Sequence, residues 1–106
     1  MAKYMFRANY TRAGVKGLLA EGGTTREAAL RDAIESAGGT LEGFYYAFGD
    51  CDLFLIAEIP DAAAATGLAL NLAAGGGLTV STTVLLSAQD LDRAVQTEVE
   101  YRAPGA

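Results

Sequence analysis

The first pattern along the chain is an alternation of polar and apolar side chains from Lys3 to Tyr10. A period of two with several aromatic residues predicts a β-strand. Thr11 follows and can cap a helix through its hydroxyl. The apolar stripe of that helix is interrupted at Gly22-Gly23, because glycine readily adopts the left-handed conformation that ends helices.

A second helix is predicted to follow the two glycines. Thr24 and Glu27 have the spacing of a capping box. Apolar residues then recur at helical spacing up to Ala37, and Gly38-Gly39 ends the helix. The first crossover is therefore expected to hold two helical pieces.

Two strands and a tight turn come next. Residues 40–48 and 53–59 favour strands, and the turn residues 49–52 between them indicate a hairpin. Residues 53–57 are apolar at every position, which is typical of a central strand covered on both faces. Pro60 ends this strand, since proline cannot continue the ladder.

The last third of the chain predicts a helix, a strand and a short second helix. Asp61 can cap an alanine-rich helix over 62–74, which the three glycines at 75–77 terminate. Residues 78–88 are rich in Thr and Val and favour a strand. A polar helix is expected over 89–99, and residues 101–106 are expected to form a flexible C-terminal tail.

The predicted order β-α-β-β-α-β indicates an α+β fold of ferredoxin-like topology, a four-stranded antiparallel sheet with its helices on one face. Right-handed crossovers place the strands in the order 4-1-3-2. We expect a single ferredoxin-like domain over residues 1–100, followed by the tail 101–106.

The other sheet face stays open in a monomer. In the strand 40–48 we place Leu41 and Tyr45 on one side, and Phe44, Tyr46 and Phe48 on the other. Each buried large apolar side chain stabilises by about 1.5–3 kcal/mol, so we expect a second copy to cover this face around a twofold axis. The alternatives are a monomer with an unusually apolar face, or a face covered by the C-terminal helix.

Composition and net charge limit the classes of partner that we expect. The apolar fraction is 51% and the net charge is −5, which favours self-association and disfavours phosphate backbones and anionic membranes. We therefore expect no nucleic acid and no membrane as partner. The N-terminal residues lack the pattern of a signal peptide, and Cys51 is the one cysteine, so a reducing, cytoplasmic location is expected.

Four stretches resemble the GYD-domain family of small bacterial proteins: Ala8 to Gly14, Ala37 to Leu41 leading into Tyr45-Tyr46, the turn Gly49 to Asp52, and Glu58 to Asp61. The resemblance covers Tyr4 to about Val95. Gly49 and Asp52 match the residues that name the family, and Cys51 stands where tyrosine is usual. The resemblance implies a dimeric α+β barrel assembly of ferredoxin-like units.

Few residues offer chemistry of their own. Histidine is absent, which removes the commonest general base and metal ligand; we expect no metal and no cofactor. Asp50 and Asp52 could form part of a metal site made of carboxylates alone. We favour the alternative that both are turn residues whose side chains bond to local N–H groups. A reactive cysteine needs a nearby cation or helix N-terminus, whereas Cys51 stands between two aspartates, so we interpret it as a small residue at a strand start.

The more promising set is Arg7, Asn9, Tyr46 and Asp52. Antiparallel pairing places the end of the first strand beside the start of the third, so Asn9 and Asp52 are expected to lie close together, with Tyr46 at the same edge. Polar groups at the mouth of an apolar cavity are typical of small-ligand sites. Arg12 could attract an anion to that mouth. The alternative is structural: Asp52 accepts backbone N–H bonds and Asn9 caps the junction.

Three functions remain open at this point. The preferred hypothesis is a non-catalytic homo-oligomeric module that binds a small, partly apolar molecule or has a regulatory role. The second is a cofactor-free enzyme, such as a monooxygenase or isomerase, with Asp52 as base and Tyr46 or Asn9 near a developing oxyanion. The third is a structural or assembly role.

Overall fold

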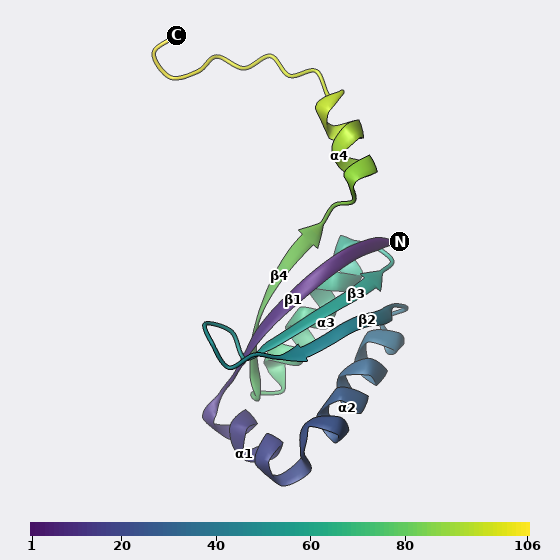
Figure 1. Cartoon of the computed structure of the whole chain (residues 1–106), viewed down its shortest axis with the longest axis vertical. Coiled ribbons are helices and arrows are strands. Elements are labelled where there is room, and N and C mark those ends of the chain that lie inside the picture. Colours follow the sequence, from purple (N-terminus) through teal and green to yellow (C-terminus); the bar gives the residue numbers. More distant parts are fainter.

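The computed structural model of the chain describes residues 1–106. The elements follow in the order β1 (Ala2–Tyr10), α1 (Arg12–Glu21), α2 (Gly23–Ser36), β2 (Thr40–Tyr46), β3 (Leu53–Ile59), α3 (Ala62–Ala74), β4 (Leu78–Leu85) and α4 (Ala88–Val95). The strands form one sheet in the order β2-β3-β1-β4 with antiparallel pairing throughout (Figure 1). The predicted ferredoxin-like topology and strand order are confirmed.

The core lies between one face of this sheet and the helices α2 and α3. Alternate residues of β1 and β3 are buried and face the helices, which is the period of two expected for a half-buried strand. The helices contribute the buried residues Leu30 and Ile34 from α2 and Ala65 and Leu68 from α3. Both helices therefore cover the same sheet face, and the residues between the buried ones form the open face.

The expectation that Leu41 and Tyr45 lie on the same side of β2 is wrong, and a β-bulge after Leu41 is the reason. The register with β3 shifts between Leu41 and Gly43. Leu41 is buried, and Phe44 and Tyr46 pack against the same core, whereas Tyr45 is 66% exposed on the other side. One extra residue in a strand reverses the faces of everything after it. The bulge includes Glu42, whose carboxylate pairs with the Lys3 ammonium at 2.9 Å.

The helix boundaries follow the predicted caps except at one place. The Thr11 hydroxyl accepts from Gly14 N at 3.1 Å and the Asp61 carboxylate accepts from Ala64 N at 2.8 Å, as expected. The capping box of Thr24 and Glu27 is wrong, because α2 already begins at Gly23 and its N-cap is Gly22 with φ 83°. The left-handed Gly22 ends α1 and starts α2 within one residue.

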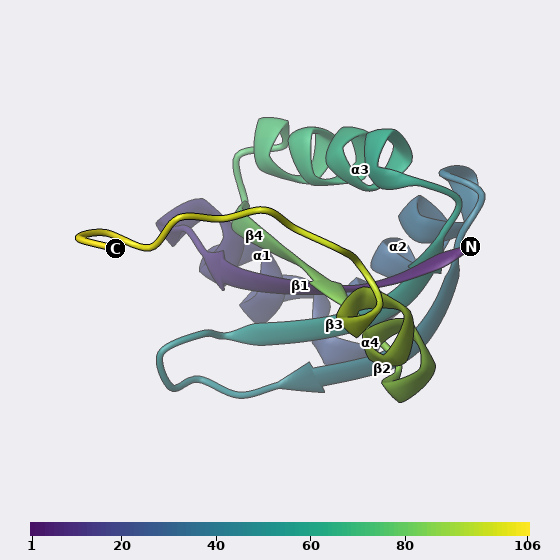
Figure 2. The same cartoon turned by 90° about the horizontal axis from the view of Figure 1, so that it is seen from above.

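The C-terminal segment leaves the body of the molecule instead of covering the open face. β4 ends at Leu85, three residues earlier than expected, and Ser87 caps α4 with a capping box to Asp90. The helix ends at Val95, so the expected helix over 89–99 is wrong for its last four residues. No residue of α4 is buried. The segment stands beyond the end of the sheet in Figure 1, and in the view from above in Figure 2 its tail crosses in front of the body and ends to the left of it. The alternative in which the C-terminal helix covers the sheet is therefore wrong.

Candidate functional site

The structure brings Asn9 and Asp52 together where β1 ends and β3 is about to begin. The Asp52 amide donates to Ala8 O at 3.0 Å and to Asn9 Oδ1 at 3.1 Å. The Tyr10 amide donates to Asp52 Oδ2 at 2.9 Å. The expected proximity of the two residues is confirmed. Each side chain holds a backbone amide of the opposite segment, which supports the structural interpretation of this pair.

Replacing Asp52 by alanine is expected to lower the free energy of unfolding by about 1–3 kcal/mol, because the partly buried Tyr10 amide loses its acceptor. Urea denaturation measures this loss. Asp50→Ala in the same loop is the control, since the Asp50 side chain is exposed and should change stability by less than about 0.5 kcal/mol. Equal effects of the two substitutions would contradict the role given to Asp52.

Cys51 is held in place beside this junction. Its side chain is 8% exposed, and Sγ lies 3.3 Å from Ala8 O and 3.1 Å from Leu53 O. A thiol is a small group and a weak hydrogen-bond donor, so it can lie against carbonyl oxygens in a confined space. These contacts agree with the interpretation of Cys51 as a small packing residue.

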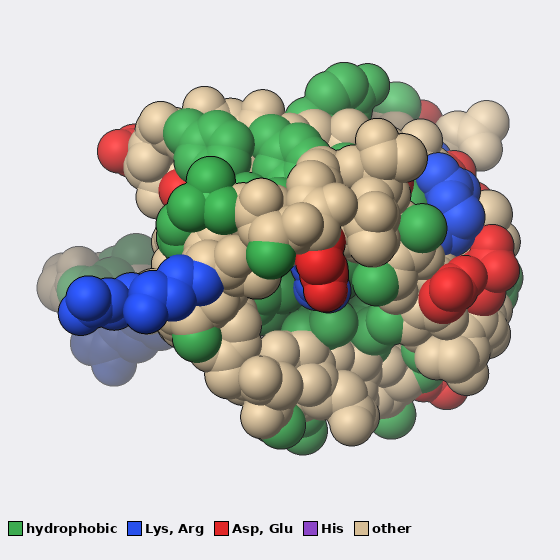
Figure 3. Space-filling view, turned by 90° about the horizontal axis from the view of Figure 1, so that it is seen from below, with side chains coloured by type: hydrophobic (Ala, Val, Ile, Leu, Met, Phe, Trp, Pro, Cys, Tyr) green, Lys and Arg blue, Asp and Glu red, His purple; other side chains and the backbone are tan.

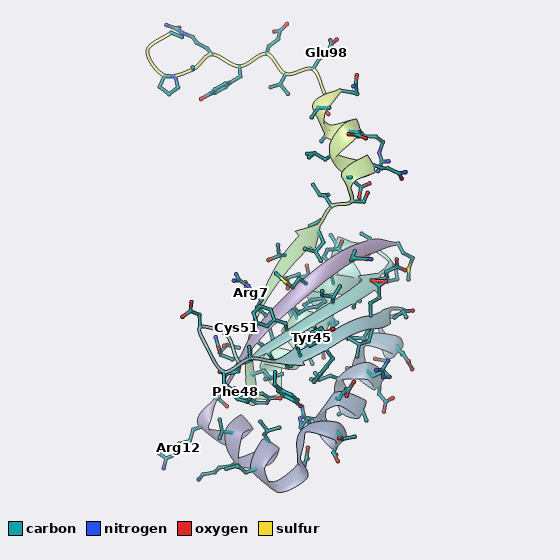
Figure 4. All side chains as sticks on the ribbon, viewed as in Figure 1. Arg7, Arg12, Tyr45, Phe48, Cys51 and Glu98 are labelled. Atoms are coloured by element: carbon teal, nitrogen blue, oxygen red, sulfur yellow. The ribbon has the colours of Figure 1, made fainter.

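Tyr46 and Arg12 do not join Asn9 and Asp52 in one polar mouth. Tyr46 lies on the helix-facing side, where its hydroxyl donates to Gly23 O at 3.0 Å and its ring meets Phe44 edge-on and stacks on Phe48. Arg12 points away from the body at the start of α1 (Figure 4). The predicted ligand set is thus divided between the two sheet faces and the solvent.

The position of Tyr46 changes its acid–base behaviour. Burial raises the pKa of Tyr46 to about 12, and the neighbouring Tyr10 adds to the shift. The folded chain therefore holds this proton more tightly than the unfolded chain, in which the phenol has its ordinary pKa near 10.

We expect the stability that Tyr46 contributes to be fully present below about pH 10 and to be lost as the pH rises toward 12. Denaturation midpoints measured from pH 9 to pH 12 should fall less steeply in Tyr46→Phe than in the unmodified protein. Tyr45→Phe, which removes an exposed hydroxyl, should retain the full slope. A Tyr46→Phe profile parallel to that of Tyr45→Phe would refute this expectation.

A cavity that the sequence did not indicate lies between α1, the start of α2 and the end of α3. It has a volume of about 330 Å³. Its wall includes four glycines, which leave space where side chains would stand: Gly14, Gly17, Gly75 and Gly77. Figure 3 looks onto this end of the molecule, where acidic and basic groups meet near the middle of the surface. The spacing of Gly14 and Gly17, close to one helical turn, is the signal that could have indicated it.

The polar groups of the cavity are Tyr10, Glu21, Arg26 and Asn71. The Tyr10 hydroxyl is buried and has no hydrogen-bond partner. Arg26 and Glu21 pair loosely at 3.5 Å. Asn71 donates from Nδ2 to Gly67 O at 2.8 Å, which leaves its side-chain oxygen as a free acceptor. Leu72 and Leu78 add an apolar wall. This mixture of one apolar wall and few polar groups is typical of a small-ligand site.

A family model described as "GYD domain" matches residues 4–95. Among curated proteins, none matches the chain. Within the fold, no helix has the length and apolar character needed to cross a membrane, and no three acidic or cysteine side chains come together as a metal site.

Proposed function

Since the chain belongs to the GYD domain family, whose fold is compatible with many functions, we propose from its geometry that it is a non-catalytic module that binds a small, partly apolar molecule. The binding site is the cavity between α1, α2 and α3, and the working unit is a homodimer joined through the open sheet faces.

The unpartnered Tyr10 hydroxyl is the observation that carries this proposal. A buried polar group without a partner costs about 1–3 kcal/mol, and most such groups in folded proteins are satisfied. The neighbouring Tyr46 hydroxyl donates its proton to Gly23 O, and the Tyr10 hydroxyl forms no hydrogen bond within the subunit. Tyr10 lines the adjoining cavity but its hydroxyl is buried, so a small shift of the ring would bring this hydroxyl within reach of an oxygen atom of a bound molecule.

The other walls indicate the chemical class of that molecule. The Arg26 side chain is only 28% exposed and its contact with Glu21 is long, so a carboxylate of the ligand could replace this loose pair with a shorter, bidentate one. Leu72 and Leu78 face the body of the ligand. These groups together fit a small apolar carboxylic acid or a related carbonyl compound.

The open sheet face supports the dimer. Met5, Phe54 and Ile56 are only half-buried there, beside the exposed ring of Tyr45. Face-to-face packing of two copies would remove these apolar side chains from water. A stable dimer of this kind buries on the order of 800 Å² from each subunit.

The experiment is an NMR titration of ¹⁵N-labelled protein with benzoate, a small apolar carboxylate, and with benzyl alcohol as the uncharged comparison. We expect benzoate to shift the amide signals of Gly14, Gly17, Gly75 and Gly77, which line the cavity. In Tyr10→Phe the affinity should fall roughly two- to tenfold, the effect of one lost hydrogen bond.

Two results would overturn the binding site. Shifts confined to residues of the open face would place the ligand elsewhere, and equal affinities of Tyr10→Phe and the unmodified protein would remove the observation on which the site rests. Arg26→Lys is the matched control for the charge: it keeps the cation but cannot form the bidentate contact, so it should weaken benzoate and leave benzyl alcohol unchanged.

A further inference from the structure

No residue of the C-terminal arm, residues 86–106, is buried against the rest of the subunit. Its helix α4 has eight residues, and so short a helix is marginal in water unless its apolar face is packed. That face contains Leu91 and Val95, which are 56% and 69% exposed. A segment with this pattern requires a surface that the subunit itself does not supply.

The tail beyond α4 has the sequence pattern of a strand but no ladder. Thr97, Val99 and Tyr101 alternate with Glu98, Glu100 and Arg102, and β-branched and aromatic residues favour strands. The side chains of Val99 and Tyr101 are 74% and 75% exposed. No strand is present after β4. The tail therefore lacks a sheet edge to pair with.

The sheet offers two edges, β2 and β4, and they differ in how well they can accept a strand. β2 has the bulge between Leu41 and Gly43, and its Glu42 side chain is held in the ion pair with Lys3; an irregular edge with charged side chains discourages added strands. β4 is regular over eight residues and has only neutral side chains: Leu78, Thr79, Val80, Ser81, Thr82, Thr83, Val84 and Leu85. An added strand therefore fits the regular, neutral edge of β4 better than the bulged edge of β2.

We propose that residues 97–103 of one subunit pair as an added strand with the outer edge of β4 in a second copy of the chain. The inference rests on the homodimer proposed above and extends its interface, because the edge of β4 stays accessible when the open faces pack together. Each subunit gives its tail to the other, as a twofold axis requires.

The side chains of the tail match the two faces at β4. Val84 is 56% exposed and Val80 is half-buried on the helix side, so Val99 and Tyr101 would cover them. On the open face, Arg7 lies directly across from Ser81, is exposed, and is absent from the ion pairs of the subunit. The small Ser81 lets the guanidinium reach past it toward a carboxylate of the added strand.

The direction of the arm favours exchange over pairing within one subunit. α4 directs the tail away from the sheet (Figure 1), and Glu98 lies far from Arg7 of the same chain (Figure 4). The ten residues from Thr97 to Ala106 span up to about 35 Å when extended, which is ample for an eight-residue strand on a neighbouring subunit.

The test measures the dimer dissociation constant of the full chain by sedimentation velocity over a range of concentrations. Val99→Pro removes a backbone donor in the exposed tail without touching the core, and we expect it to weaken the dimer about tenfold or more. Val99→Thr keeps the donor and strand preference and should leave the constant within about twofold. An unchanged constant for Val99→Pro would overturn the inference.

Charge exchange tests the contact with Arg7 directly. Arg7→Glu and Glu100→Arg should each weaken the dimer, and the double variant should restore it at least in part. Failure of the double variant to recover would contradict the proposed register on the open face.

Two further readouts separate this inference from the homodimer itself. If Ile56→Asp on the open face gives monomers while Val99→Pro leaves the dimer intact, the exchanged tail is wrong and the sheet-face dimer stands. If the unmodified chain is monomeric at all concentrations, both are wrong. Amide hydrogen exchange at residues 97–103 completes the test: protection should appear only in the dimer, and protection in dilute monomer would show pairing within one subunit instead.

Discussion

Replacing Gly14 by alanine is expected to lower the free energy of unfolding by about 3 kcal/mol, the upper part of the range for overpacked sites. A Cβ at this position would lie 2.0 Å from Gly77 O and 2.8 Å from the Gly77 carbonyl carbon. These are backbone atoms, so they cannot move aside as a flexible side chain would. The substitution therefore separates α1 from the chain that leads into β4.

The contact at Gly14 is tight because two hydrogen bonds hold the same segments together. Thr11 N donates to Gly77 O at 2.9 Å, and the Thr11 hydroxyl donates to Gly76 O at 2.7 Å. Moving α1 far enough to accept a methyl group would lengthen both. Since Gly14 and Gly77 also line the cavity, Gly14→Ala should reduce benzoate binding together with stability.

Gly17→Ala is the matched control on the same helix. A Cβ at Gly17 would meet nothing within 4 Å, so alanine should stabilise the helix by about 0.5–1 kcal/mol. Thermal or urea denaturation of the two variants should thus give changes of opposite sign. If both variants lose stability to the same extent, the close approach of Gly14 to Gly77 is not the cause of the loss.

The strand order and the sheet faces of β1 and β3 could be predicted from the sequence because their signals are local. Alternation from Lys3 to Tyr10 sets the buried face of β1, and the short turn at 49–52 forces β2 and β3 to be neighbours. The caps Thr11 and Asp61 likewise act within one turn of their helices. Such features depend on residues that are close in sequence.

The features that sequence could not provide depend on backbone geometry or on distant contacts. The bulge at Leu41 and Gly43 leaves no clear composition signal, yet it reverses the faces of Tyr45 and Tyr46. The choice of Gly22 over Thr24 as the cap of α2 follows from the left-handed backbone at Gly22, which joins two helices without a loop. Both errors concern single residues within correctly predicted elements.

The candidate site shows the same division. Antiparallel pairing of β1 with β3 was enough to predict that Asn9 and Asp52 meet. The cavity was missed because its walls come from α1, α2 and α3, whose ends approach one another only in the folded chain. Tyr10 looked like the last apolar position of a strand, and only its buried, unpartnered hydroxyl reveals a second role.

Leu55→Ala in β3 is expected to lower the free energy of unfolding by about 2–5 kcal/mol, the cost of a core cavity. Leu55 is 1% exposed and lies between Phe6 on β1 and Phe44 on β2. The loss should be the same at every protein concentration, because these contacts lie within one subunit. Urea denaturation at two concentrations, a hundredfold apart, measures it.

The neighbouring residue Ile56 points to the opposite face and should respond differently. It is half-buried on the open face, between Met5 and Gly43. Ile56→Ala should cost the isolated subunit less than Leu55→Ala, and its cost should grow with protein concentration, because mass action makes the apparent stability of a dimer depend on subunit concentration. A loss for Ile56→Ala that is independent of protein concentration would show that the open face is not part of a dimer interface. It would remove the basis for the homodimer. Two adjacent residues of one strand thus separate the forces that fold the subunit from those that join it to its copy.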